Sequence, residues 1–184
     1  AWGKLYGQLA MGTCVFVYDF DKFIPENMLA VMEKYKITTF CAPPTMFRFF
    51  IKAGLGGYDL SSLKYCTIAG EALNPEVYNK WYEYTGIRLM EGFGQTESTA
   101  ILANLKGMTP KPGSMGKPTP LYNVELVDPQ GNIVPPGEVG EICVRGEFTH
   151  TPGLFRGYYR SPKITDEAWH DGLYHTGDTA WRDE

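Results

Sequence analysis

The fold is decided by the stretch Ile87-Arg88-Leu89-Met90-Glu91-Gly92-Phe93-Gly94-Gln95-Thr96-Glu97. Its first four residues form a short apolar run that predicts a strand. The two glycines behind that strand let the backbone come close to a ligand. The aromatic ring can stack on a planar group, and a carboxylate beside a hydroxyl can hold a metal ion together with a phosphate. The stretch therefore indicates a strand that leads into a nucleotide site.

The chain before this stretch alternates strand and helix signals. Prolines mark the start of two helices, because proline fits the first helical turn, and Asn74 can cap the second of them. The predicted strands are Thr13–Val17, Thr38–Ala42, Leu63–Ala69 and Ile87–Met90, and the predicted helices begin at Pro25, Thr45 and Pro75. Alternation at this spacing predicts parallel strands joined by right-handed crossovers.

From about Lys106 the pattern changes, because prolines and glycines now separate short apolar runs. The runs Val124–Val127, Ile133–Val134 and Glu141–Val144 predict antiparallel strands, and a short helix is expected at Thr165–His170. The predicted fold class is α/β. A parallel-sheet αβ unit is expected over residues 1–105, followed by a small antiparallel, β-barrel-like subdomain over residues 106–184.

Composition excludes several classes of partner and site. The net charge is −4 and no basic cluster occurs, which argues against a nucleic-acid partner. No apolar run approaches the roughly 20 residues of a membrane helix. The start, Ala1–Lys4, lacks the basic flank and apolar stretch of a signal peptide.

The cysteines and histidines predict no metal site. The four cysteines are widely spaced without a CxxC pair, so we expect buried, reduced thiols in a cytoplasmic protein. The histidines His150, His170 and His175 are too scattered for a local metal motif, and we expect structural or surface roles for them.

Two further elements accompany the opening stretch. Ligands of open α/β sheets bind beyond the carboxyl ends of the strands, and Gly70-Glu71-Ala72 follows the third predicted strand. An aspartate just past a strand, as in Thr176-Gly177-Asp178, can bind a ribose diol. Taken singly, each element also has a purely structural interpretation. Gly70-Glu71-Ala72 could be a plain strand-to-helix turn, Thr96 and Glu97 could be ordinary residues at the start of a helix, and Gly177-Asp178 could be a common turn.

Taken in order, these elements form a specific set. The segments are Gly70-Glu71-Ala72, Gly94-Gln95-Thr96-Glu97, Gly140-Glu141-Ile142-Cys143-Val144-Arg145-Gly146 and Tyr174-His175-Thr176-Gly177-Asp178, with Lys111–Pro118 as a proline-glycine connection. The set closely resembles the adenylate-forming family, which comprises acyl-CoA synthetases, luciferases and the adenylation domains of peptide synthetases. With Trp2-Gly3-Lys4, it is most similar to short- and medium-chain acyl-CoA synthetases.

The resemblance implies a two-step reaction. A carboxylic acid attacks the α-phosphorus of ATP to give an acyl-adenylate and pyrophosphate, and the thiol of coenzyme A then displaces AMP. Such chemistry requires an in-line nucleophile and neutralisation of the spreading charge.

The resemblance also implies roles for individual residues. The predicted nucleotide-binding residues are Gly70, Glu71, Ala72, Glu91, Gly92, Phe93, Gly94, Gln95, Thr96 and Asp178. Among them Phe93 would stack on the purine and Thr96 would contact the phosphates. Asp178 would accept hydrogen bonds from both ribose hydroxyls. Thr96 and Glu97 are the predicted catalytic pair, with Glu97 as the Mg²⁺ ligand. Trp2 and Gly70 would lie beside the acyl group.

The match has two departures and two missing parts. The family usually has tyrosine at position 93, and often an apolar residue where Thr179 stands. The family's phosphate loop and its lysine-bearing C-terminal domain have no counterpart here. We therefore expect an internal piece of a longer enzyme, inactive alone.

Two alternatives stay open. The piece could be a nucleotide-binding or inert scaffold, or part of an adenylation domain that loads a carrier protein.

Overall fold

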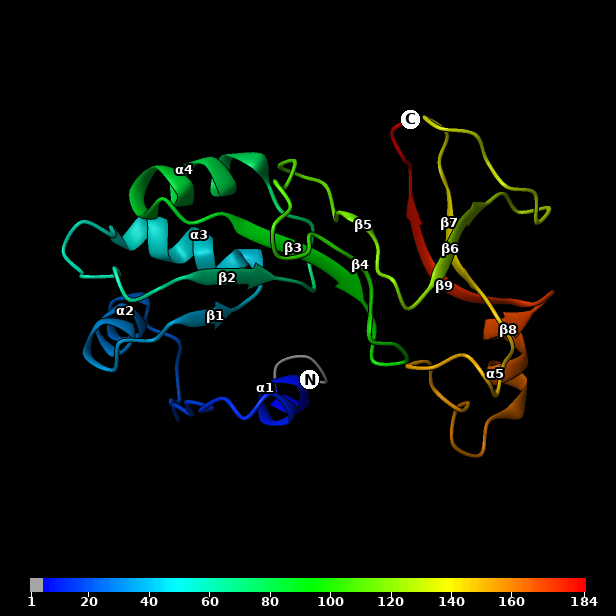
Figure 1. Ribbon diagram of the computed structural model, residues 1–184, viewed down its shortest axis with the longest axis horizontal. Helices are drawn as coiled ribbons and strands as arrows, with labels where there is room; N and C mark the ends of the chain where they lie inside the picture. The colour runs from blue at the N-terminus through cyan, green and yellow to red at the C-terminus, as the bar shows by residue number, and fades with distance from the viewer. Residues whose placement is uncertain (1–4) are drawn as a thin grey trace. The chain divides into compact units, whose positions relative to one another are not determined.

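The computed structural model describes residues 5–184 (Figure 1). The helices are α1 (Gly7–Ala10), α2 (Pro25–Lys34), α3 (Pro44–Ala53), α4 (Pro75–Thr85) and α5 (Pro162–Ala168). The strands are β1 (Thr39–Cys41), β2 (Tyr65–Ile68), β3 (Leu89–Gly94), β4 (Ala100–Ala103), β5 (Lys117–Pro118), β6 (Asn123–Val127), β7 (Gly140–Arg145), β8 (Trp169–His170) and β9 (Leu173–Ala180). No described helix combines the length and the apolar character needed to cross a membrane.

The chain divides into two compact units. We call the part up to Gly94, together with Leu102–Lys117, the αβ unit. The β unit consists of Gln95–Ile101 and Pro118–Glu184. The chain therefore passes between the units more than once, whereas the sequence suggested one boundary after residue 105.

The αβ unit has the predicted parallel sheet. Strands β1–β5 are adjacent in numerical order, and β1, β2 and β3 pair in parallel with Thr39 opposite Tyr65 and Cys66 opposite Leu89. Helices α2, α3 and α4 accompany these strands (Figure 1). Each begins at a proline, whose missing N–H costs nothing in the first turn. Asn74 caps α4 as predicted, accepting from Glu76 N at 2.8 Å.

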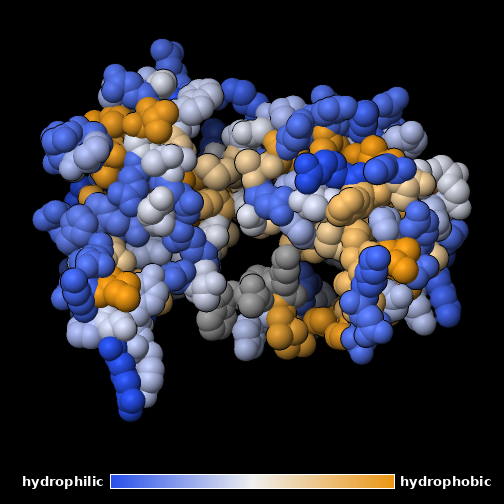
Figure 2. Space-filling model, turned by 180° about the vertical axis from the view of Figure 1, so that it is seen from behind, coloured by the Kyte–Doolittle hydropathy of each residue, from blue (hydrophilic) through white to orange (hydrophobic). Residues whose placement is uncertain are grey.

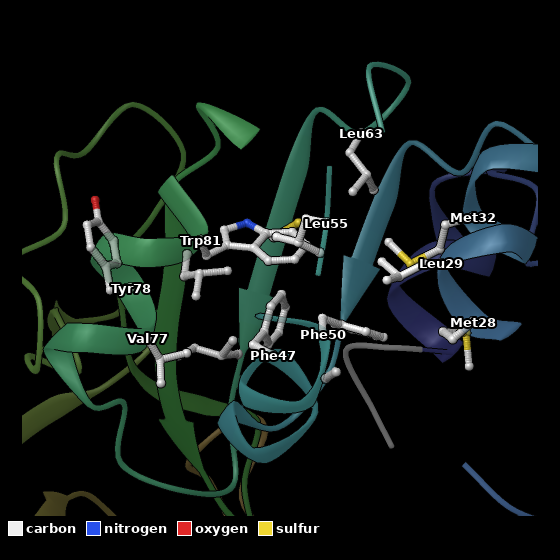
Figure 3. Close-up of a cluster of buried hydrophobic side chains, with 14 of the residues drawn as sticks. Met28, Leu29, Met32, Phe47, Phe50, Leu55, Leu63, Val77, Tyr78 and Trp81 are labelled. Carbon is white, nitrogen blue, oxygen red and sulfur yellow. The ribbon is translucent and has the colours of Figure 1, made fainter. Parts of the chain in front are cut away.

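The core of the αβ unit is aromatic. Trp81 of α4 and Phe47 of α3 are both 0% exposed, and their rings meet edge to face at 4.8 Å (Figure 3). Phe40 of β1 packs against Phe47 at 5.8 Å, so helices and sheet share one cluster. Buried aromatic pairs of this geometry add to the stabilisation from burial itself. The cluster holds the strand ends at fixed positions.

The β unit contains an open antiparallel sheet. Its strand order is β6-β7-β9-β8, and no closed barrel is formed by the described residues. The barrel-like expectation is therefore not confirmed. The register between β7 and β9 shifts, because Cys143 lies opposite His175 whereas Glu141 lies opposite Thr179. The extra residues of β9 form a bulge, which includes Gly177 and Asp178.

Three local predictions were wrong. Thr13–Val17 belongs to no strand, because no described segment pairs with it, and an unpaired strand is not stable in water. Val17 at its end is 82% exposed and Met11 just before it is 79% exposed, and apolar surface is visible at several places in Figure 2. Helix α5 begins earlier than predicted, and Trp169–His170 is a strand. Ile133 makes only an isolated bridge, with Val127.

Candidate active site

The stretch from Glu91 to Glu97 is divided between the two units. Residues up to Gly94 belong to strand β3 of the αβ unit, whereas the segment that begins at Gln95 belongs to the β unit. The predicted strand end after Met90 was therefore wrong, since the strand continues through both glycines. Each half of the stretch has its own set of contacts.

In the αβ unit, the loop after β2 contains the predicted adenine-binding residues. Gly70 has φ +95°, a conformation that side chains rarely adopt. Glu71 is exposed, and its carboxylate accepts a hydrogen bond from Thr45 Oγ1 at 2.6 Å. Ala72 is exposed as well. The loop thus presents backbone at Gly70 and Ala72 and a carboxylate held by the start of α3.

Glu91 ties this loop to β3. Its side chain is buried, and Oε1 accepts from Leu73 N at 3.2 Å. Burial raises the pKa of Glu91, and the hydrogen bond from Leu73 opposes that rise. The Glu91 carbonyl accepts from both the backbone and the side-chain amide of Asn104, at 2.9 and 3.1 Å. Glu91 therefore lies inside the unit and supports the loop, instead of lining an open wall.

The remaining β3 residues are more accessible. Gly92 and Phe93 are half-buried, and Gly94 is exposed. A side-chain carbon at Gly92 would meet the Leu102 carbonyl at 3.4 Å, which is an ordinary contact distance. Phe93 thus keeps part of its ring surface available for stacking.

In the β unit, the other half of the stretch is fixed to the segment around Leu154. Phe155 N donates to the Glu97 carbonyl at 2.7 Å, and Thr99 N donates to the Gly153 carbonyl at 3.0 Å. Ser98 forms a bridge with Leu154. Backbone hydrogen bonds on both sides of Ser98 hold Gln95–Thr99 in place without a helix.

Gln95 holds the predicted ribose ligand. Its amide nitrogen donates to Asp178 Oδ2 at 2.7 Å and to the Thr176 carbonyl at 2.8 Å. Its amide oxygen accepts from Tyr174 OH at 2.7 Å. All amide atoms of Gln95 are therefore engaged, which orients the exposed carboxylate of Asp178.

Two tyrosines surround the predicted catalytic glutamate. Tyr158 OH donates to Glu97 Oε1 at 2.9 Å. Burial, and the negative charges of Glu97 and Asp178, raise the pKa of Tyr174. Burial and the bond to Glu97 likewise raise the pKa of Tyr158. Both tyrosines therefore stay protonated and donate hydrogen bonds at neutral pH.

The bulge in β9 presents Asp178. Gly177 N donates to Glu141 Oε1 at 2.9 Å, and Thr176 Oγ1 donates to the Ile142 carbonyl at 2.7 Å. Gly177 has φ +74°, a backbone conformation that residues with a side chain rarely adopt. The prediction that Asp178 follows a strand was wrong in detail, since it lies within β9, at the bulge.

The structure brings Gln95 and Asp178 together, and Glu91 with the loop after Gly70. Thr96 lies exposed in the turn beside Glu97. Trp2, predicted beside the acyl group, lies outside the described residues. Sequence reasoning missed Tyr158 and Tyr174 as partners of the site. Tyr174 is the first residue of the segment Tyr174–Asp178 and could have been noticed, whereas Tyr158 has no comparable signal.

The sequence profile described as AMP-binding enzyme matches residues 1–159. The chain belongs to the AMP-binding enzyme family. The motifs that carried the resemblance thus lie in a chain whose family membership extends over most of its length.

Relatives in this family share about two fifths of the sequence. The chain is 40% identical over all 184 residues to human acyl-coenzyme A synthetase ACSM3, mitochondrial, covering 31% of it. It is 41% identical to human ACSM5, mitochondrial, over 184 residues and 32% of that protein. The chain thus spans about a third of the length of the curated relatives it matches.

Solved structures of an acyl-CoA synthetase and of a CoA ligase have the same fold. The Brucella canis acyl-CoA synthetase matches with a TM-score of 0.86 and 30% identity, over 100% of this chain and 34% of that one. The anthranilate CoA ligase AuaEII, in complex with anthranoyl-AMP, matches with a TM-score of 0.85 and 29% identity, over 94% and 32%. These neighbours confirm the predicted fold class of parallel αβ unit plus antiparallel sheet.

One expectation is contradicted. The composition suggested a cytoplasmic protein, but the relatives ACSM3 and ACSM5 are named as mitochondrial. The expectation rested on reduced thiols, which do not distinguish between compartments with reducing interiors.

Proposed function

We propose that this chain is part of an AMP-forming acyl-CoA synthetase, which converts a carboxylic acid to an acyl-adenylate and then to a coenzyme A thioester. The observation that carries the proposal is the match of all 184 residues of this chain, at about 40% identity, to enzymes named as acyl-coenzyme A synthetases. Family membership supports the AMP chemistry, and the names of the relatives support acyl and coenzyme A substrates.

The residues of the β unit are suited to hold the ribose and phosphates. Asp178 is a carboxylate whose direction is set by Gln95, as binding of a vicinal diol requires. Thr96 offers a hydroxyl in the turn between Gln95 and Glu97. A fixed acceptor such as Asp178 binds without reorganisation, which is how positioned polar groups favour a transition state.

The residues of the αβ unit are suited to hold the base. Phe93 offers part of a ring face, and Gly70 and Ala72 offer backbone atoms without a bulky side chain. Glu71 adds a carboxylate positioned by Thr45. Glu91 acts indirectly in this proposal, since its buried carboxylate supports the backbone at Leu73. Trp2 and Gly70 stay predictions as acyl contacts.

Glu97 fits the role of a Mg²⁺ ligand. Its carboxylate is half-buried, and Tyr158 holds one oxygen at 2.9 Å, so the group is oriented. Carboxylate oxygen is the donor that Mg²⁺ prefers, and the ion would neutralise charge on the phosphates. The outer hydrogen bond from Tyr158 resembles the support that metal-binding carboxylates commonly have.

The test is acid-dependent ATP–pyrophosphate exchange by the complete polypeptide that contains this chain. We expect exchange with a subset of a panel of carboxylic acids, and thioester formation when coenzyme A is added. Asp178→Ala should abolish both, whereas Asp166→Ala on exposed α5 should abolish neither. Exchange without thioester formation would favour loading of a carrier protein, and absence of exchange with every acid would contradict the proposal. The isolated 184-residue chain should give no exchange.

A further inference from the structure

Three metal-binding side chains lie together in the β unit, outside the residues assigned above to the nucleotide. Glu141 and Cys143 are two residues apart on β7, so they share a face, and His175 lies opposite Cys143 on β9. One ligand atom from each lies within 4.8 Å of the other two. The sequence hides this group, because the cysteine and the histidine are separated by 32 residues.

The distances are close to those of a zinc site. His175 Nδ1 lies 2.9 Å from Glu141 Oε2 and 3.4 Å from Cys143 Sγ. Ligands of tetrahedral zinc, at about 2.0–2.3 Å from the metal, lie about 3.3–3.7 Å apart. The His175–Cys143 pair already has this spacing, the His175–Glu141 pair needs to separate by only a few tenths of an ångström, and the ligand atoms of Glu141 and Cys143 lie within 4.8 Å of each other. Thiolate and imidazole together favour zinc over magnesium or calcium.

The surroundings hold the ligands and attract a cation. The ring of His170 stacks on His175 at 3.8 Å with 14° between the planes, which restrains the imidazole. A hollow of about 390 Å³ is lined by Glu141 and His175. Its lining also carries the carboxylates of Asp128 and Asp171, and its one arginine is already paired with a glutamate outside the lining. The hollow gives room for a water as fourth ligand and gives a route for the ion.

We propose that Glu141, Cys143 and His175 bind Zn²⁺, with a water molecule in the fourth position. As the zinc–sulfur bond forms, the Cys143 thiol releases its proton to solvent. The proton shared by His175 Nδ1 and Glu141 also leaves, and the neutral ring keeps its one proton on Nε2, so that zinc takes the place of this hydrogen bond. Burial, with Glu141 and Glu125 nearby, raises the pKa of the thiol to about 12, so this proton loss opposes binding.

The site is joined to the bulge that presents Asp178. Glu141 Oε2 would bind the ion, while Oε1 keeps its hydrogen bond from Gly177 N at 2.9 Å. His175 and Glu141 lie on opposite sides of the register shift between β7 and β9. Zinc would therefore link the two strands across the bulge and stabilise it. This inference does not depend on the proposed acyl-CoA synthetase activity.

Co²⁺, which reports tetrahedral thiolate coordination by its absorption, is the probe. The 184-residue chain, freed of metal and kept reduced with a phosphine, is titrated with Co²⁺ alone. We expect visible ligand-field bands and a near-ultraviolet sulfur-to-cobalt band that saturates at one ion per chain and disappears when Zn²⁺ is added. Cys143→Ser should lose the sulfur band, and His175→Asn should weaken binding by more than the roughly 10- to 100-fold that loss of an outer partner costs, because a ligand itself is removed.

Matched variants separate this site from other cysteines and histidines. The double variant Cys14→Ser/Cys41→Ser and the exposed-histidine variant His150→Asn should bind Co²⁺ as the unchanged chain does. Thermal unfolding without metal checks that each variant folds, and Zn²⁺ should raise the midpoint of the unchanged chain but not that of His175→Asn. A sulfur band that survives Cys143→Ser, no sulfur band in the unchanged chain, or an equal Zn²⁺ shift in His175→Asn would overturn the proposal.

Discussion

Gln95 Nε2 donates a hydrogen bond to Asp178 Oδ2 at 2.7 Å, across 83 residues of sequence. The same amide group donates to the Thr176 carbonyl and accepts from Tyr174. Gln95 is thus the residue that connects the turn containing Thr96 and Glu97 to the bulge containing Asp178. Its position directly after β3 makes it the first residue of the β unit.

The first prediction concerns this bond. Gln95→Ala should weaken AMP binding by roughly ten- to a hundredfold, because a hydrogen bond to a charged group contributes about 1.5–3 kcal/mol. Gln95→Glu should weaken it further, because a second carboxylate would then face Asp178. Calorimetry with AMP on the complete polypeptide measures both. Gln130→Ala, in an exposed turn, is the control. Equal affinities for Gln95→Ala and the control would contradict the role of Gln95.

The second prediction concerns the support of Glu97. Tyr158→Phe removes the hydroxyl that donates to Glu97 at 2.9 Å and leaves the ring in place. The Mg²⁺ concentration needed for half-maximal pyrophosphate exchange should rise by about tenfold, as expected when an outer partner of a metal ligand is lost. The neighbouring Tyr159, which is 84% exposed, provides the control Tyr159→Phe. If both variants require the same Mg²⁺ concentration, Tyr158 does not orient a metal ligand.

The third prediction is a pH dependence of stability. Burial raises the pKa of Glu91 above its ordinary value of 4.5, so the folded chain holds this proton more tightly than the unfolded chain does. The contribution of Glu91 to stability is therefore greatest below its unfolded pKa and is lost as the pH rises toward its folded pKa. Glu91→Gln cannot lose a proton, and the variant should gain stability relative to the unchanged chain between about pH 4 and pH 7.

Urea unfolding at several pH values measures this difference. Glu83→Gln, at an exposed position of the same unit, should show no comparable gain. The two chains are compared by their free energies of unfolding at each pH. If the difference between Glu91→Gln and the unchanged chain stays constant across this pH range, the ionisation of the buried carboxylate is not the source of that difference.

The fourth prediction compares two glycines of the αβ unit with nearly equal backbone angles. Gly116 and Gly107 have φ +96° and +94°. A side chain at Gly116 would overlap the backbone of Ala103, whereas nothing lies within 4 Å of one at Gly107. Gly107→Ala should therefore cost only the conformational strain, about 1–2 kcal/mol. Gly116→Ala should cost at least about 2 kcal/mol more, because backbone must move.

Chemical unfolding of both variants gives the comparison directly. The two substitutions add the same methyl group at the same φ, so their difference isolates the approach of the segment around Gly116 to Ala103. Equal losses of stability would mean that this approach is looser than the structure indicates.

Prediction from the sequence succeeded where the signal is local. The prolines at positions 25 and 75 begin helices, and Asn74 caps the second of them. The core strands were found to within a few residues, because each is a continuous apolar run. Thr13–Val17 has the same kind of run but pairs with no described strand, so propensity alone gave the wrong answer there.

The candidate site was predictable only in part. Its motifs identified the family, and Gln95 and Asp178 were both chosen, but as separate contacts to a nucleotide. The bond between them, the support of Glu97 by Tyr158, and the burial of Glu91 had no sequence signal. Each depends on contacts between residues that are far apart in the sequence.

The sequence by itself determined the alternation of strands β1–β3 with helices α2–α4, the proline starts of α2 and α4, and the family, because these follow from neighbouring residues and short motifs. Only the tertiary structure decided that the stretch Glu91–Glu97 is shared between two units, and that Gln95 meets Asp178. It also decided that Cys143 faces His175. The physical reason is the pairing of β7 with β9 and its bulge, since hydrogen bonding between distant strands fixes which side chains meet.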